Sequence, residues 1–269
     1  MKPAAFDYIR AESADEAVSL LAEYSEDARI LAGGQSLIAV LNMRLAQPRV
    51  LIDISRIAGL SYVRRSNGHL AIGAAVTQAS LEWRAGLAEE VPLLAHAFPH
   101  IGHFQTRNRG TVCGSIAYAD PSAELPLCLV GLKGEVVLRS QRGRRTLKAD
   151  DFFQGMLLTE CAPDEFVEEV RYPVARVGVR YAFAEVAMRH GDFALVSLAA
   201  VADAEGIGLA VGGVADRPTL ARWPRDAVID DALAEFAWSL EAQDDNHASA
   251  QYRRHLVRTL GEKLIRGLA

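Results

Sequence analysis

The chain has little cysteine: Cys113, Cys128 and Cys161 are the three in 269 residues. An odd and widely spaced set excludes a disulfide framework and an all-cysteine iron–sulfur cluster within this chain, and it favours a reducing compartment. Any redox chemistry of this protein therefore requires a bound cofactor.

Long apolar runs and concentrated positive charge are missing as well. No segment approaches the roughly 20 apolar residues of a bilayer span. The first residues, MKPAAFDYIRAESADEA, have no apolar core and carry acids early, so we expect no secretory signal. The net charge of −5 disfavours nucleic acid as a partner, because phosphate binding needs clustered basic residues. We expect a cytoplasmic protein without a membrane span.

Motifs that would assign a chemistry by themselves are also absent. No G-x-G-x-x-G opens a helix, which argues against a Rossmann site, and no Walker loop occurs. The G-x-S-x-G motif of the serine hydrolases is absent as well. His96, His100 and His103 lie close in sequence, but Pro99 and Gly102 interrupt any helix there. We therefore expect hydrogen-bonded or solvated histidines and no metal site.

What is present is an ordinary globular composition, with 50% hydrophobic and 23% charged residues. Ser13 and Glu16 form a capping box before AVSLLAEY, which predicts a helix. ARILA predicts a buried strand that ends at Gly33 and Gly34, followed by a helix over 36–44 and a strand over RVLIDI. The glycine pair thus lies where a strand leads into a helix.

The remaining pattern predicts two further domains. SYVRR, HLAIGAAVT, EVVLRS and the residues around RRTLKADDFF predict strands, and SLEWRAGL, VPLLAHAFPH and residues 125–132 predict helices. YAFAEVAMR, FALVSLAAVA and IGLAVGGVA predict an antiparallel sheet, and two helices end the chain. We place the domains at residues 1–56, 57–176 and 177–269.

Two glycine-rich segments, LAGGQSL at 31–37 and RGTVCGSIAYADPSAE at 109–124, are predicted to be loops and are the candidate binding elements. Adjacent glycines present backbone N–H groups without side chains in the way, and a following helix directs its positive end at the same place. Hydroxyl groups of Ser36, Thr111 and Ser115 add donors. The residues alone indicate a possible dinucleotide site, since a glycine pair is more often only a tight turn.

Four blocks in order carry a resemblance: AGGQSL at 32–37, IGHFQTRNRGTVCGSIAYADPSAELP at 101–126, DFFQGMLLTECAPDEFVEEVRYP at 151–173 and FAEVAMRHGDFALVSLAA at 183–200. Over nearly its whole length the chain resembles the FAD-binding medium subunit of the molybdenum hydroxylases, the family of carbon monoxide dehydrogenase and xanthine dehydrogenase. The resemblance implies an α+β fold: a two-part FAD-binding domain of the PCMH/vanillyl-alcohol-oxidase-like type plus a C-terminal antiparallel sheet-and-helices domain.

The resemblance also implies the site residues. Ala32, Gly33, Gly34, Gln35, Ser36 and Leu37 would form the first pyrophosphate-binding segment, and Thr111, Gly114 and Ser115 the second. Tyr118 and Glu124 would contact sugar hydroxyls, Ile101 and Gly102 would line a ring pocket, and Arg189 and Asp192 would steady a closing segment. No residue is assigned as an acid–base or nucleophilic catalyst.

The chain departs from the family at two places. The family usually has T-I-G-G in the second segment, whereas this chain has Cys113 in place of the first glycine. We expect Cys113 to be a small packed residue rather than a redox thiol, and Cys128 and Cys161 to be core residues. Phe183 and Glu185 stand where many relatives carry Tyr and Lys, which puts a tyrosine or lysine role at the flavin in doubt.

Charged pairs outside these blocks receive ordinary interpretations. The neighbouring acids Asp150-Asp151, Glu168-Glu169 and Asp230-Asp231 are expected to diverge in a strand or to lie on a solvated face. The basic run RSQRGRR at 139–145 is expected to be an exposed turn, with partner docking as the lesser alternative.

The function implied by the resemblance is electron transfer. A large partner with molybdopterin would oxidise a substrate, favoured as an N-heteroaromatic compound, and a small partner with [2Fe–2S] clusters would pass electrons to FAD here and on to an external acceptor. The assembly would be a dimer of heterotrimers. Two alternatives stay open: a stand-alone FAD-dependent oxidoreductase, and an assembly module without flavin.

Overall fold

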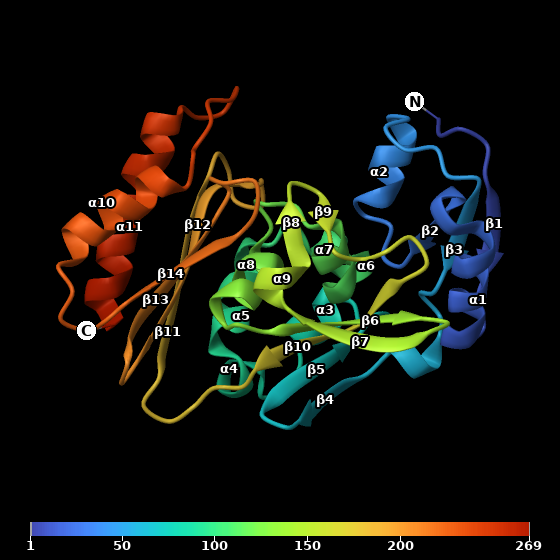
Figure 1. Cartoon of the computed structure of the whole chain (residues 1–269), viewed down its shortest axis with the longest axis horizontal. Helices are drawn as coiled ribbons and strands as arrows, with labels where there is room; N and C mark the ends of the chain where they lie inside the picture. Colours follow the sequence, from blue (N-terminus) through green and yellow to red (C-terminus); the bar gives the residue numbers. More distant parts are fainter. Residues whose placement is uncertain (1, 269) are drawn as a thin grey trace.

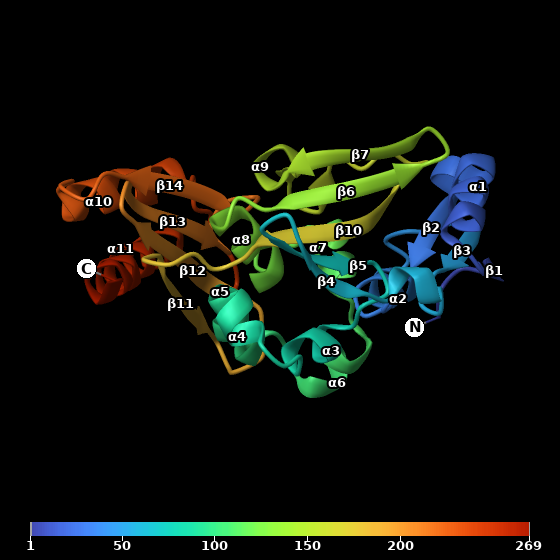
Figure 2. The same ribbon diagram turned by 90° about the horizontal axis from the view of Figure 1, so that it is seen from below.

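The computed structural model describes residues 2–268 and contains three larger sheets that follow one another along the chain (Figure 1). The first and third lie at opposite ends of the molecule, and the second lies between them with the helices that surround it (Figures 1 and 2). No helix within residues 2–268 has the length and apolarity needed to cross a bilayer. The two predicted domain boundaries, after residues 56 and 176, remain predictions.

The first sheet is parallel, with strand order β1-β3-β2. Its elements are β1 (Asp7–Arg10), α1 (Ala14–Tyr24), η1 (Ser25–Asp27), β2 (Ala28–Leu31), α2 (Leu37–Asn42) and β3 (Val50–Asp53). Ser13 caps α1 as predicted, accepting from the Glu16 N–H, although the Glu16 carboxylate accepts from the Glu12 N–H rather than from Ser13. Strand β1 was not predicted, because DYIR has mainly exposed side chains and no clear alternation.

The second sheet is antiparallel, with strand order β4-β5-β10-β6-β7. Its strands are β4 (Val63–Ser66), β5 (His69–Gly73), β6 (Glu135–Ser140), β7 (Gly143–Lys148) and β10 (Phe166–Pro173). Shorter elements accompany it: η2 (Ala58–Leu60), α9 (Ala149–Phe152) and the small pair β8 (Phe153–Gly155) and β9 (Leu158–Thr159).

A set of short helices lies between β5 and β6: α3 (Gln78–Glu82), α4 (Leu87–Glu90), α5 (Pro92–Ala97), η3 (Phe98–His100), α6 (Phe104–Arg109), α7 (Val112–Tyr118) and α8 (Glu124–Gly131). The expectation of a loop over 109–124 is therefore wrong for most of that segment. Only residues near Gly110 and residues 119–123 are non-helical. Val112, Cys113 and Ile116 form the buried face of α7, but Gly114 and Ser115 between them hide this helical pattern in the sequence.

The third sheet is the predicted antiparallel one, with β11 (Arg180–Ala187), β12 (Ala194–Asp203), β13 (Gly206–Gly212) and an unpredicted edge strand β14 (Thr219–Trp223). Helices α10 (Ile229–Ser239) and α11 (Ala250–Leu268) cover one face. Even-numbered β12 residues such as Leu198 and Ala200 pack in the core with these helices, whereas Ala199 and Val201 join the core of the second sheet. The odd positions of β11 and β12 thus face the second sheet's helices.

The basic run at 139–145 contains an exposed turn at Gln141 and Arg142, as expected, and this turn joins β6 to β7 in a hairpin. Arg139 and Arg144 both bind Glu168, and Arg145 binds Glu165. The neighbouring acids Glu168 and Glu169 diverge on β10, as predicted, but both are buried and neither lies on a solvated face.

Candidate functional site

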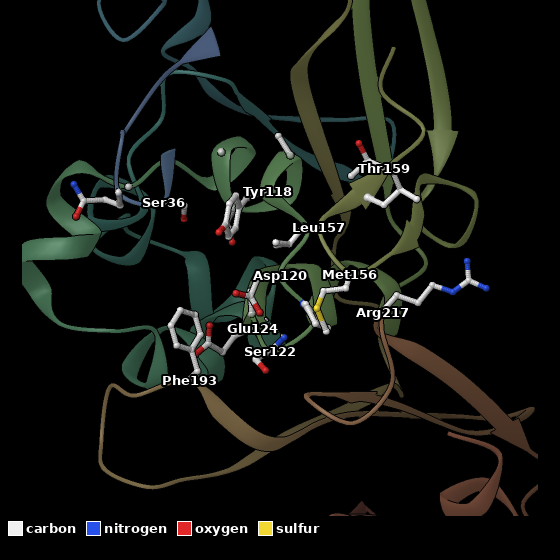
Figure 3. Close-up of a pocket in the computed structure, with 18 of the residues that line it drawn as sticks. Ser36, Tyr118, Asp120, Ser122, Glu124, Met156, Leu157, Thr159, Phe193 and Arg217 are labelled. Carbon is white, nitrogen blue, oxygen red and sulfur yellow. Dashed lines mark hydrogen bonds between the residues drawn. The ribbon is translucent and has the colours of Figure 1, made fainter. Parts of the chain in front are cut away.

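A cleft of about 1980 Å³ runs between the three sheets and is lined by residues from all of them. This volume exceeds the roughly 300–1,000 Å³ of an ordinary small-molecule pocket and is in keeping with an extended ligand. Figure 3 shows side chains from several segments converging on it, among them Ser36, Tyr118 and Glu124.

Every site residue predicted from the sequence lines this cleft. They are Ala32, Gly33, Gly34, Gln35, Ser36, Leu37, Ile101, Gly102, Thr111, Gly114, Ser115, Tyr118 and Glu124. Arg189 and Asp192 line it too, and their side chains form an ion pair of 3.1 Å.

The two glycine-rich segments touch each other. A Cβ atom built on Gly33 would lie 2.3 Å from the carbonyl oxygen of Arg109 and 2.7 Å from the Gly110 Cα, so no side chain fits at Gly33. Gly34 has φ of 72°, a conformation that L side chains rarely adopt. The close approach of the two backbones requires glycine and places both segments on one ligand-sized space.

The first segment presents free donors to the cleft. The backbone N–H groups of residues 34–37 have no acceptor within residues 2–268. The first backbone hydrogen bond at the start of α2 is the one that the Ile38 N–H donates to the Gly34 carbonyl. Ser36 stands at the N-cap but its hydroxyl makes no capping bond. Consecutive free N–H groups in a bend are the arrangement that binds phosphate oxygens.

Hydrogen bonds within the second segment and to residues 76–78 fix its backbone. The Thr111 hydroxyl accepts from the Gly114 N–H at 3.0 Å, and a Cβ on Gly114 would lie 2.6 Å from that oxygen. Val112 donates to Val76, and Gln78 donates from its N–H to Gly110. The Gln78 side-chain Oε1, which is buried at the cleft, lacks a partner among the described residues.

Two acidic side chains at the cleft, Glu124 and Asp120, have raised pKa values. Burial raises the pKa of Glu124 to about 7, and the charge of Asp120 adds to this. Burial also raises the pKa of Asp120, although its carboxylate accepts from the Ser122 N–H at 2.9 Å. The Tyr118 pKa is raised by burial and by Asp120.

Several lining residues were not predicted. Met156, Leu157 and Leu158 are exposed apolar residues at the β8–β9 turn, and Leu157 has φ of 56° and donates to the Ala119 carbonyl. The run of three apolar residues in MLLT was the available signal. Phe193 and Arg217 also line the cleft, and only the register of the third sheet brings them there (Figure 3).

The departures from the family have simple local structures. Cys113 lies within α7, buried, and its thiol donates to the Ile72 carbonyl at 3.4 Å, so it is a packed residue as expected. Burial raises the pKa of the Cys113 thiol well above its usual range. Phe183 packs on the His100 ring at 5.1 Å, and the Glu185 side chain is buried beside it. Cys128 is buried, and Cys161 is partly buried.

Comparison with known proteins agrees with this geometry. Residues 4–175 match the family described as the FAD binding domain in molybdopterin dehydrogenase. The nicotine 6-hydroxylase medium subunit of Paenarthrobacter nicotinovorans is 38% identical over 279 residues, 98% of each chain. The glyceraldehyde dehydrogenase medium chain of Sulfolobus acidocaldarius is 36% identical over 283 residues, 100% of each chain.

Two solved structures share the whole fold. Carbon monoxide dehydrogenase from Hydrogenophaga pseudoflava superposes with a TM-score of 0.92 at 31% identity, covering 100% of this chain and 98% of that one. Quinoline 2-oxidoreductase from Pseudomonas putida 86 gives 0.92 at 32% identity with the same coverage.

Fold and site together define a flavoprotein of the oxidoreductase class. The chain belongs to the family of FAD-binding domains in molybdopterin dehydrogenases. It is the medium, FAD-binding subunit of such an enzyme. The resemblance predicted from the four sequence blocks is thereby confirmed. The donor set also fits this cofactor: the free N–H groups of 34–37 and a bend that only glycine can form suit an anionic diphosphate.

Proposed function

We propose that this chain is the electron-transfer subunit of a heteromeric molybdenum hydroxylase. A large partner with molybdopterin oxidises the substrate, and a small partner with [2Fe–2S] clusters passes electrons to FAD in this chain and on to an external acceptor. The observation that carries the proposal is the contact between the two glycine-containing segments at one cleft. The clusters are assigned to a partner because three dispersed cysteines cannot ligate one here.

The residues of the cleft divide among the parts of the cofactor. The N–H groups of 34–37, with the Ser36 hydroxyl, bind the pyrophosphate from one side, and Thr111, Gly114 and Ser115 meet it from the other. Tyr118 and Glu124 form hydrogen bonds with sugar hydroxyls, as donors or as acceptors. Ile101 and Gly102 form part of the wall for a flat ring.

The protein supplies binding and orientation, and FAD supplies the capacity to accept two electrons and release them singly or together. The loop with Arg189 and Asp192 closes the cleft from the third sheet, where Gly191 packs so tightly on His103 that a Cβ would lie 2.8 Å from its ring. This contact holds the loop at the edge of the cleft.

The partners and substrate follow from the relatives. We propose a dimer of heterotrimers in the cytoplasm, and an N-heteroaromatic substrate, because nicotine 6-hydroxylase and quinoline 2-oxidoreductase are named for such compounds. The division into residues 1–56, 57–176 and 177–269 is proposed to separate the two FAD-binding parts from the closing domain. Co-purification of a large and a small chain with this subunit tests the assembly.

The test of the cleft is Gly33→Val, compared with Gly59→Val. A valine at 33 meets the Arg109 carbonyl, whereas a Cβ at Gly59 meets nothing within 4 Å. We expect the first variant to lose its flavin while remaining folded and the second to retain it, measured as the flavin-to-protein absorbance ratio after gel filtration. Equal flavin content in both variants contradicts the proposal, and a wild-type protein that takes up no FAD favours a module without flavin.

A finer test is Ser36→Ala, which removes one hydroxyl donor from the first segment. Loss of a neutral hydrogen bond weakens binding by about 0.5–1.5 kcal/mol, and more when the acceptor is a charged phosphate. The measurement is calorimetric titration of flavin-free protein with FAD. An unaltered dissociation constant removes Ser36 from the site.

A further inference from the structure

Two buried polar groups without partners lie on one row of the third sheet. Within residues 2–268, the buried side-chain atoms that lack a hydrogen-bond partner include Oε2 of Glu185 and Oγ of Ser197. Glu185 on β11 is the register partner of Ser197 on β12, so the two side chains stand next to each other on the same face. Buried polar groups nearly always have a hydrogen-bond partner, so two adjacent side chains with unpaired polar atoms need an explanation.

This row faces the wall of the cleft. Ser197 pairs in turn with Gly212 on β13, and a Cβ at Gly212 would lie 2.8 Å from the Ser197 hydroxyl and 3.1 Å from the carbonyl of Pro121. Pro121 precedes α8, whose first residue is Glu124, and α8 packs on β12 and β13. Glu124 is 7% exposed and its remaining surface lines the cleft.

The other end of the row leads to solvent. The Glu185 side chain is 3% exposed, and its second oxygen, Oε1, lies 3.9 Å from Nδ1 of His100. The His100 ring is half-buried and lies 6.3 Å, between ring centres, from the exposed ring of His190. The ionisable side chains of His190, His100, Glu185 and Glu124 therefore form a series from the surface to the cleft.

We infer that Glu124 and Glu185, with the Ser197 hydroxyl beside Glu185 on the neighbouring strand, are a proton relay that carries protons from His100 and His190 at the surface to the cofactor cleft. The inference rests on the proposed function, because an iron–sulfur partner supplies electrons alone, whereas two-electron reduction of a flavin consumes at least one proton. Glu124 releases one proton into the cleft, Glu185 returns one to Glu124, and His100 returns one to Glu185 from solvent. The two electrons come from the partner's cluster.

The surroundings of the row favour carboxyl groups that hold protons near neutral pH. Burial, and then the charge of Glu124, raise the pKa of Glu185 to about 8, and burial lowers the pKa of His100. The titratable and charged groups that act on this row are His100, His190, Glu124, Cys128, Asp120 and Arg107. Arg107, the one guanidinium among these groups, is already bound to Glu82, so it does not pair with the acids.

The first measurement needs no flavin reduction. The infrared spectrum of the purified protein at pH 7 should show the carbonyl band of a protonated carboxyl group, which shifts in D₂O and disappears on titration above pH 8. Glu185→Gln should abolish the titration near pH 8, whereas Glu235→Gln, an exposed acid on α10, should leave it unchanged. A titration that is the same in Glu185→Gln and in wild type overturns the inference, whether or not the protein binds FAD.

The second measurement uses the FAD-loaded protein and excess dithionite as the electron donor. Proton transfer by a positioned group contributes about 10²–10⁴-fold to rates, so partial loss of the relay should slow flavin bleaching at least about tenfold at pH 7 in Glu185→Gln. Ser197→Ala, which removes one hydroxyl and serves if Glu185→Gln does not fold, should slow it as well. Full flavin content with an unaltered rate in these variants overturns the relay, whereas absence of flavin from wild type contradicts the proposed function instead.

Discussion

Two groups of buried carboxylates in this protein differ in their partners. Glu168 and Glu169 on β10 are as buried as Glu124 and Glu185 beside the cleft. Glu168 binds Arg139 at 2.5 Å and also Arg144, while no arginine among residues 2–268 is bound to Glu124 or Glu185.

The partners decide the charge state. Burial alone would raise the pKa of Glu168, but hydrogen bonds from Arg144 and Arg139 outweigh it and lower the pKa. The same holds for Glu169, where Tyr62 and Arg171 are the main donors. Without such donors, burial dominates at Glu185 and Glu124. One set is therefore ionised and structural at neutral pH, and the other retains exchangeable protons.

The largest expected effect is a pH dependence of stability that Glu185 causes. Its pKa is about 8 in the folded chain against an ordinary 4.5, so between these values the folded state holds a proton that the unfolded state has released. The free energy of unfolding therefore falls as pH rises from 4.5 to 8, by about 2–4 kcal/mol. Urea unfolding of wild type and Glu185→Gln at pH 5.5 and 8.5 measures this.

Glu185→Gln should remove most of that slope and be the more stable protein at pH 8.5. Parallel stability curves for the two proteins would mean that Glu185 is ionised when folded, like the acids on β10. Glu235→Gln is the control for a surface acid and should follow wild type at both pH values.

A smaller effect of opposite sign is expected for Glu168→Gln. The change leaves Arg144 without its carboxylate and leaves Arg139, whose side chain is 17% exposed, with only the exposed Asp15. We expect a loss of about 2 kcal/mol at pH 7, below the usual 3–5 for a fully buried pair because Arg144 is largely solvated. The pKa of Glu168 is lowered, so its stabilisation is present above pH 4.5 and is lost on acidification; wild type and variant should converge at low pH. A constant difference down to pH 3 contradicts the ion-pair explanation.

The sequence was sufficient for many of the elements and for most of the cleft. Alternation predicted β11 to β13, the capping box predicted α1, and the predicted site residues all line one cleft. Local rules succeed there because propensity, capping and turn chemistry act over a few residues. The helix α7 was missed because Gly114 and Ser115 mimic a loop.

Tertiary register was beyond local rules. Nothing in the sequence indicates that Glu185 stands opposite Ser197, or that Glu124, 61 residues before Glu185, lies near enough to raise its pKa, because tertiary packing sets these contacts. The ion pairs of the arginines in RSQRGRR were missed for the same reason: Arg145 binds Glu165 and Arg144 binds Glu168, which lie 20 and 24 residues further along the chain. Most partners of these buried acids, such as Arg139 and Arg144, belong to other strands, and only the sheet brings them together.

The smallest effect separates the two guanidiniums that share Glu168. The Arg144 side chain is 60% exposed, so its ion pair is screened by water, whereas Arg139 is mostly enclosed. Exposed pairs contribute about 0.2–1 kcal/mol, and we expect Arg144→Gln to cost no more than that, since Arg139 still holds the carboxylate. Arg139→Gln should cost more. Urea unfolding of both variants at 50 mM and at 500 mM salt is the measurement, and salt should reduce the Arg144 effect first. If Arg144→Gln is the more damaging change, then Arg144, and not the enclosed Arg139, keeps Glu168 ionised.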